Sequence, residues 1–186
     1  GGAKVLAVDR QAYGSDTLST HALMRPAVIQ LARWGLLDRL IASGAPVIET
    51  TTFHYGADEV TVPIRAEPGI PGLLAPRRTV LDRTLVDAAR RAGATVVQDV
   101  SVTDLVLGPR GRVRGVVLRD AAGSERSIAA GHVAGADGIG SAIARKTQAA
   151  TLLRGTASVA HIYGYSAVPG LSGYHWYFAD GLAGAL

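Results

Sequence analysis

An acidic residue closes the first apolar run of the chain. Residues 5–8 are all apolar, and Asp9 and Arg10 follow them directly. A continuous apolar run is typical of a parallel strand buried on both faces. In dinucleotide-binding proteins, an acid at the tip of such a strand accepts hydrogen bonds from a ribose. A solvated acid at a strand end looks the same, so this pair leaves both interpretations open.

A glycine-rich turn around a second acid lies later in the chain. Residues 132–136 predict a short strand, and residues 137–141, Asp-Gly-Ile-Gly-Ser, then lead into a predicted helix that runs to about Lys146. Free backbone N–H groups and the positive helix end beside Asp137 suit the phosphates or sugar hydroxyls of a dinucleotide. Alternatively, Asp137 or Ser141 serves only to cap the helix.

Two arginines, Arg77 and Arg78, stand directly before the most regular helical pattern, residues 79–92. Within it, Thr79 and Asp82 have the spacing of an N-terminal capping pair. Positive charge is unfavourable beside a helix N-terminus, which is itself positive, so a nearby anion would explain the two arginines. Arginines exposed to solvent are the alternative.

Periodicity and turn residues place these features on alternating helices and strands. Pro26 opens a helical pattern that Gly35 interrupts, and a second short helix ends at Ser43 and Gly44. We expect strands at residues 47–53, 59–64, 95–98, 102–107, 112–119 and 127–130, a loop at 67–76, and two or three strands within 156–186.

Aromatic residues gather in the last quarter of the chain. Tyr163 and Tyr165, and then Tyr174, Trp176 and Phe178, alternate along the sequence and indicate one face of a sheet. They either pack a core or line a pocket for an aromatic substrate.

Composition excludes several classes of site. The 186 residues include no cysteine, which rules out disulfides, thiolate zinc sites and cysteine nucleophiles. The five histidines lack metal-ligand spacing, so we expect no metal site. The net charge of +4 comes from arginines spread along the chain, which argues against a nucleic-acid partner. No apolar run reaches the roughly 18 residues of a membrane helix. We therefore expect a cytoplasmic protein without membrane contact.

The order and spacing of three features resemble a known family. They are the strand with Asp9 and Arg10, the pattern Arg-x-x-x-Asp-x-x-Leu-x-x-Ala at 78–88, and Gly-Ala-Asp-Gly-x-Gly-Ser at 135–141. Together they resemble the FAD-dependent aromatic monooxygenases, the p-hydroxybenzoate-hydroxylase-like group of single-component flavoproteins. The resemblance extends over nearly the whole chain and is strongest over residues 1–150.

The resemblance implies a set of FAD contacts. Asp9, with Arg10 beside it, would hold the adenosine ribose, and the backbone of Val102 would meet the adenine. Asp137 and Gly138 would lie near the pyrophosphate and ribityl chain, at a motif that the family also uses with NAD(P)H.

Two arginines complete the implied set. Arg78 matches a polar side chain that contacts the cofactor, and Arg25 occupies a loop near the phosphates or the flavin. The expected fold is α/β, a Rossmann-like FAD-binding domain interleaved with a mixed β-sheet substrate domain. Residues 1–46 and 77–155 would form the FAD-binding domain, and residues 47–76 and 156–186 would supply substrate-domain strands.

The resemblance also implies a reaction. In that family NAD(P)H reduces the FAD, O2 adds at the flavin C4a, and the hydroperoxide hydroxylates an electron-rich small molecule, here expected to be aromatic. The cofactor does the oxygen chemistry, so we name no catalytic side chain. The alternatives are a flavin-dependent reductase or halogenase of the same fold, or a non-catalytic nucleotide-binding module.

The start of the chain yields a testable expectation. The family opens with a strand and a G-x-G-x-x-G turn that receives the pyrophosphate, and Gly1 and Gly2 would fall just after that turn. A later Gly-Asp motif for the ribityl chain would lie beyond Leu186. We therefore expect a fragment of a longer protein, and this chain alone to bind FAD weakly or not at all. A tight, stoichiometric complex with flavin absorbance would contradict this expectation.

Overall fold

The structure is a computed structural model, which describes residues 2–19, 21–156, 162–165 and 170–185. The chain divides into two compact units. Unit 1 comprises Gly1–Tyr13 and Ala89–Tyr165, and unit 2 comprises Gly14–Ala88 and Ser166–Leu186. Each unit is therefore built from segments that are far apart in the sequence.

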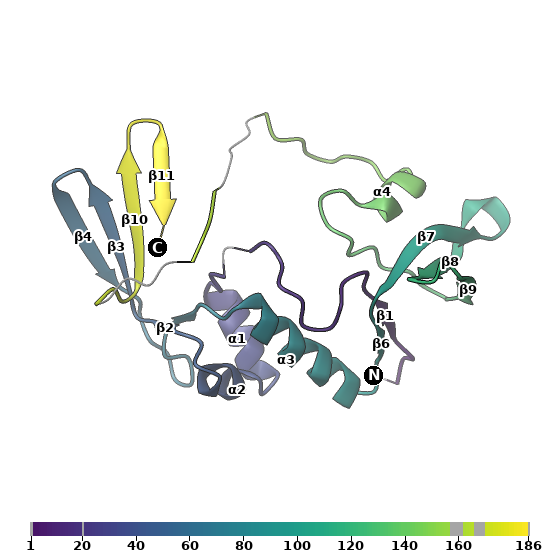
Figure 1. Cartoon of the computed structure of the whole chain (residues 1–186), viewed down its shortest axis with the longest axis horizontal. Helices are drawn as coiled ribbons and strands as arrows, with labels where there is room; N and C mark the ends of the chain where they lie inside the picture. The colour runs from purple at the N-terminus through teal and green to yellow at the C-terminus, as the bar shows by residue number, and fades with distance from the viewer. Residues whose placement is uncertain (1, 20, 157–161, 166–169, 186) are drawn as a thin grey trace. The chain divides into compact units, whose positions relative to one another are not determined.

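Unit 1 contains two small sheets and a short helix (Figure 1). Its first sheet pairs β1 with β6 in parallel, and its second is antiparallel in the order β7-β8-β9. Helix α4 packs against β7. The elements are β1 (Leu6–Val8), β6 (Thr95–Val97), β7 (Val100–Leu107), the 3₁₀ turn η1 (Pro109–Gly111), β8 (Val113–Asp120), β9 (Glu125–Ala129) and α4 (Ala142–Lys146).

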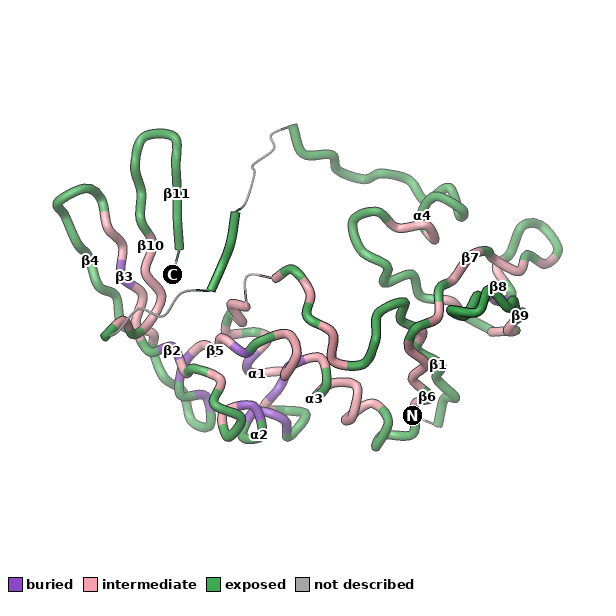
Figure 2. Tube along the Cα trace, in the orientation of Figure 1, coloured by how far each residue is buried: buried purple, intermediate pink, exposed green. Residues whose placement is uncertain are grey.

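The apolar core that Figure 2 shows as buried lies around the helices of unit 2. Pro26 suits the first turn of α1, where its missing N–H has no helical partner, and Gly35 ends that helix with a φ of +67°. The elements around this core are α1 (Arg25–Arg33), α2 (Leu37–Ala42), β2 (Val47–Ile48), β5 (Leu73–Leu74) and α3 (Arg78–Arg91). The buried side chains are those of Val28, Leu31, Leu36, Leu37, Leu40, Ile70, Leu74 and Leu81.

A four-stranded sheet forms the rest of unit 2, in the order β11-β10-β3-β4. Its strands are β3 (Thr50–Tyr55), β4 (Asp58–Pro63), β10 (Tyr174–Ala179) and β11 (Leu182–Ala185). β10 runs parallel to β3, and the two outer pairs are antiparallel. Gly173 enters β10 with a φ of +85°, and any Cβ there would collide with Thr50. Glycine is therefore required where β10 meets β3.

Most expected elements are present, with the end residues shifted slightly. The predicted tail strands appear as β10 and β11, while residues 157–161 and 166–169 lie outside the described residues. Tyr163 and Tyr165 are in coil rather than in a strand, so the prediction that they share a sheet face is wrong. The expected loop at 67–76 contains β5, because Leu73 and Leu74 find a partner in β2.

Two local predictions are wrong for identifiable reasons. Residues 132–136 form no strand, since no described segment pairs with their backbone groups. Thr79 does not cap α3, because the helix begins one residue earlier, at Arg78, and Thr79 lies in its first turn. Asp82 pairs instead with Arg78, one helical turn away.

Among the described residues, no helix has both the length and the apolar character needed to cross a membrane.

The core of unit 2 generates a stability prediction. Leu40 is 0% exposed, so Leu40→Ala leaves a cavity and should lower the free energy of unfolding by about 2–5 kcal/mol. Leu152 is 96% exposed, and Leu152→Ala should change the free energy of unfolding by less than about 0.5 kcal/mol. Urea denaturation followed by circular dichroism measures both changes. Equal losses in the two variants would contradict the placement of the core.

Candidate functional site

The backbone around Asp9 is held at the end of the parallel pair in unit 1. Asp9 N donates to Val97 O at 2.9 Å, and Val100 N donates to Asp9 O at 3.1 Å. Asp99 N donates to Gln11 O at 3.4 Å. Asp99 has a left-handed φ of +58°, which allows the tight turn between β6 and β7. The pairing of β1 and β6 thus continues past both strands and sets the position of Asp9.

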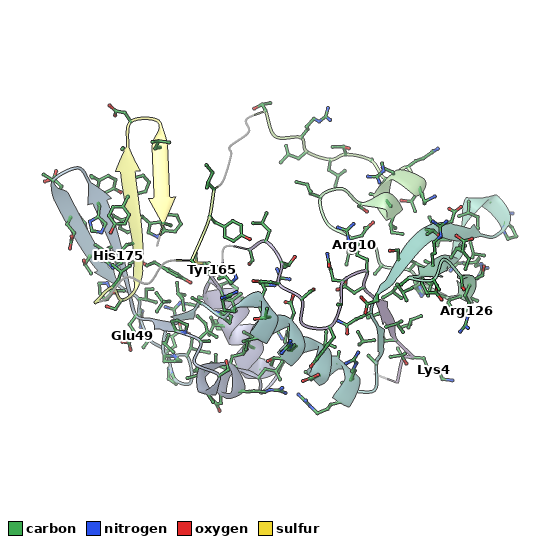
Figure 3. All side chains as sticks on the ribbon, viewed as in Figure 1. Lys4, Arg10, Glu49, Arg126, Tyr165 and His175 are labelled. Atoms are coloured by element: carbon green, nitrogen blue, oxygen red, sulfur yellow. The ribbon has the colours of Figure 1, made fainter. Side chains whose placement is uncertain are left out.

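One carboxylate oxygen of Asp9 remains available. Its Oδ1 accepts from Gln11 N at 2.9 Å, which closes a short turn after β1. Its Oδ2 has no hydrogen-bond partner among the described residues, and the residue is exposed. Arg10 is also exposed, with no ion pair to any described residue (Figure 3). Among the described residues, this strand end therefore offers a carboxylate oxygen and a guanidinium that have no partner, on consecutive residues of the chain.

Strand β7 carries one of the other predicted positions of unit 1 and contacts the helix that follows the remaining two. Both β1 and α4 contact β7, which carries the half-buried Val102. The pairing of β7 with β8 shifts between Val102 and Asp104, so Thr103 is the extra residue of a β-bulge. Bulges bend a strand locally and are common beside functional sites.

Asp137 caps α4 with both carboxylate oxygens. Its Oδ1 accepts from Ser141 Oγ, and its Oδ2 accepts from Ala142 N at 2.7 Å and Ile143 N at 3.2 Å. Ser141 Oγ in turn accepts from Ala144 N at 2.9 Å. The Ser141 hydroxyl, together with these backbone N–H groups, holds the pKa of Asp137 below its ordinary value. Asp137 therefore does cap this helix, as one of the two interpretations of the motif predicted.

Glycines let the turn before α4 fold back onto the helix. Gly138 has a φ of +80°, and a Cβ on Gly135 would collide with the side chain of Ile143. Lys146 Nζ, at the other end of α4, lies 2.9 Å from Asp104 Oδ1 and ties the helix to β7. The capped turn is thus attached to the same strand as Val102.

The two remaining predicted arginines lie in unit 2 and have acidic partners. Arg25 Nη1 lies 3.3 Å from Glu67 Oε1, and its Nη2 donates to Arg65 O. Arg78 donates to both carboxylate oxygens of Asp82, from Nε at 2.8 Å and from Nη2 at 2.9 Å. This paired carboxylate raises the pKa of the Arg78 guanidinium.

Arg77 likewise lies 2.8 Å from Asp16. The anions that the sequence suggested beside the start of α3 are therefore carboxylates of this protein.

The predicted positions thus fall in both units. Asp9, Arg10, Val102, Asp137 and Gly138 belong to unit 1, and Arg25 and Arg78 belong to unit 2. Sequence reasoning missed Asp99, whose left-handed backbone sets the connection beside Asp9. The signal was present, since aspartate tolerates that conformation better than most residues.

No group of three or more potential metal ligands occurs among the described residues.

The chain matches one protein family over almost its whole length. Residues 1–174 match the model of a family described as "FAD binding domain". No curated protein sequence matches the chain significantly.

Solved flavoprotein structures share the fold. CmlS, a flavin-dependent halogenase, is 27% identical over 79% of this chain, with a TM-score of 0.65. The myxobacterial chondrochloren halogenase CndH is 25% identical over 69% of this chain, with a TM-score of 0.59. PqsL, a probable FAD-dependent monooxygenase from Pseudomonas aeruginosa, is 17% identical over 94% of this chain, with a TM-score of 0.70.

The chain spans less than half of each of these proteins: 27% of CmlS, 30% of CndH and 47% of PqsL. The similarity confirms the predicted fold class, an α/β FAD-binding domain with mixed sheets.

The cap of α4 predicts a dependence on pH. Because folding lowers the pKa of Asp137, its contribution is present above the ordinary value of 3.8 and is lost as the pH falls through the lower folded pKa. Protection of the Ala142 and Ile143 amides from hydrogen exchange should therefore decrease between about pH 6 and about pH 3. Asp137→Asn should show the reduced protection already at the higher pH.

Amides of β8, which do not depend on this cap, are the control. Equal pH dependence of α4 protection in the wild type and in Asp137→Asn would show that this carboxylate does not hold the helix.

Proposed function

The chain belongs to the FAD binding domain family, and from this premise we propose that unit 1 binds the adenosine end of FAD for an FAD-dependent oxygenation. The free Oδ2 of Asp9 is the observation that carries the proposal. It lies at the carboxyl end of a parallel strand, where an acid accepts hydrogen bonds from ribose hydroxyls. Arg10 and the backbone of Val102 would complete the contacts with the adenosine.

The cap supports a positioning role for Asp137. Its carboxylate accepts hydrogen bonds from the first turn of α4, so we propose that Asp137 shapes the turn before this helix. We propose that the backbone at Gly138 faces the pyrophosphate or ribityl chain. Arg78 Nη1 and Arg25 Nε have no acceptor among the residues that the structure describes, and these are the atoms proposed to reach the cofactor.

The strand pairing of unit 2 supports the proposed division into domains. β3 and β4 come from residues 47–76, β10 and β11 come from residues 156–186, and the four strands form one sheet. We propose that this sheet belongs to the substrate domain and that residues 1–46 and 77–155 form the FAD-binding domain.

FAD, when bound, would supply the redox chemistry that links NAD(P)H to O2. The residues of this chain would bind and orient the cofactor. The proposed substrate is a small aromatic molecule, and product analysis with NAD(P)H and O2, in the natural protein that carries this chain, tests the reaction. Gain of one oxygen atom by the substrate is the expected result.

Halogenation is the second candidate, favoured by the identity of 25–27% with CndH and CmlS. A product in which chlorine or bromine replaces hydrogen, formed only with added halide, would identify it. Oxidation of NAD(P)H without a modified product would indicate a reductase, and FAD binding without turnover would indicate a nucleotide-binding module.

Asp9→Asn tests the cofactor site. The amide oxygen keeps the turn to Gln11, while an NH2 group replaces the free acceptor oxygen. Loss of a hydrogen bond to a charged group costs about 1.5–3 kcal/mol, so FAD affinity should fall about 10- to 150-fold. Titration of flavin fluorescence measures the affinity, in the natural protein that carries this chain, because the chain alone is expected to bind FAD weakly or not at all.

Asp120→Asn is the matched control. Asp120 Oδ1 closes a similar turn in unit 1 by accepting from Ala122 N and Ser124 N, both at 2.9 Å, but it lies at the β8–β9 hairpin. Its substitution should leave FAD affinity unchanged. Equal affinities in Asp9→Asn and Asp120→Asn would overturn the assignment of Asp9.

A further inference from the structure

A row of side chains crosses one face of the four-stranded sheet in unit 2. In the order of the strands, Gly184 on β11 pairs with Tyr177 on β10, Tyr177 with His54 on β3, and His54 with Glu59 on β4. Directly paired residues project from the same face, so these four positions lie side by side. The row contains a carboxylate, an imidazole and a phenol, and then a position without a side chain.

The rings in this row are stacked. The His54 and Tyr177 rings are nearly parallel, with 3° between their planes and 4.2 Å between their centroids. The spacing of neighbouring strands, about 4.8 Å, allows rings on paired residues to stack in this way. One face of the Tyr177 ring is therefore covered by His54.

A chain of polar contacts holds His54 in place behind Tyr177. His54 Nδ1 lies 3.3 Å from Glu59 Oε2, and His54 Nε2 lies 3.0 Å from His175 Nδ1. His175 Nε2 lies 2.9 Å from Ser172 O. Both nitrogens of each histidine are thus engaged, and the imidazole of His54 is a fixed support for the phenol ring.

Space remains on the other side of Tyr177. Gly184 pairs directly with Tyr177, and a Cβ built on Gly184 would meet no heavy atom within 4 Å. An open groove of about 320 Å³ includes this position, with the half-buried His54 and the exposed Tyr177, Ala179 and Leu182 among its lining. That volume is at the lower end of small-molecule sites and suits a ligand of one or two rings.

We propose that the position over Gly184 binds a planar aromatic ring, which stacks on the free face of Tyr177 as the next ring of the row. The ring would occupy the place that a side chain at residue 184 would fill, and Ala179 and Leu182 would contact its edge. Gly184 is then a specificity-determining residue, because any larger side chain would fill the position that the ring occupies. Identification of this ring as the substrate of the oxygenation rests on the proposed function, whereas the binding itself does not.

The opposite face of the sheet offers a matched control. Ala183 pairs with Phe178 and Phe178 with Tyr55, so the position equivalent to Gly184 already carries a methyl group there. The Phe178 and Tyr55 rings are stacked with 5.0 Å between their centroids. Gly184→Val and Ala183→Val therefore add bulk to adjacent residues of one exposed strand, on opposite faces. Neither position has the left-handed φ that would strain a valine.

The experiment is a fluorescence titration of the whole chain, without FAD, using 1-naphthol as the probe. The wild type and Ala183→Val should bind it with the same Kd. Gly184→Val and Tyr177→Leu should each weaken binding at least about tenfold, since an aromatic pair and its buried area contribute on this order. The saturated analogue decahydro-1-naphthol, followed by competition, should displace the probe at least about tenfold less effectively because it cannot stack.

Three results would overturn the proposal: no saturable binding of 1-naphthol, an unchanged Kd in Gly184→Val, or equal competition by the saturated analogue. The analogue tests stacking in the wild type and does not depend on the folding of a variant. The FAD titrations of Asp9→Asn are independent of this result. If FAD binding fails while naphthol binding is retained, the proposed function is wrong and the proposed aromatic-ring site at Gly184 still stands.

Discussion

Parallel pairing between distant segments is the constraint on which the rest of the structure depends. A short hairpin cannot close a parallel pair, so the chain must leave the first strand and return before the second is added. Within the described part of the chain this occurs twice, with β1 and β6 in unit 1 and with β3 and β10 in unit 2. The first pair sets the position of Asp9, and the second places His54 beside Tyr177. Both candidate sites therefore arise where the chain returns to an earlier strand.

Local hydrogen bonding decides which acids remain available to a ligand. Asp9 and Asp137 both end apolar segments of sequence, and both were candidates for contact with a cofactor. Asp137 precedes the unpaired N–H groups of a helix, which occupy its oxygens, whereas Asp9 has only the N–H of Gln11 to bind. The same side chain therefore holds a helix end in one place and offers a free acceptor in the other.

Acids of the chain also pair with several of its arginines. Arg25, Arg78 and Arg119 each lie beside an acid of this chain, at N···O distances of 3.3, 2.8 and 2.8 Å. Exposed pairs of this kind contribute only about 0–1 kcal/mol each to stability. Arg10 differs from these three in having no such partner among the described residues.

The sequence by itself determined most of the element types and the acid that follows the first strand. These depend on periodicity and on turn residues within a few positions of one another, and such signals are local. It also predicted the capping alternative for Asp137, because that motif is contained within residues 137–143.

Only the tertiary structure decided which strands pair and which side chains meet. His54 and His175 are 121 positions apart, and no local pattern relates them. The register of β10 on β3 places their rings together, and the register of β11 on β10 sets Gly184 opposite Tyr177. A shift of one residue in either pairing would turn these side chains to the other face of the sheet. Register is a property of the folded pair of strands, and it cannot be read from either strand alone.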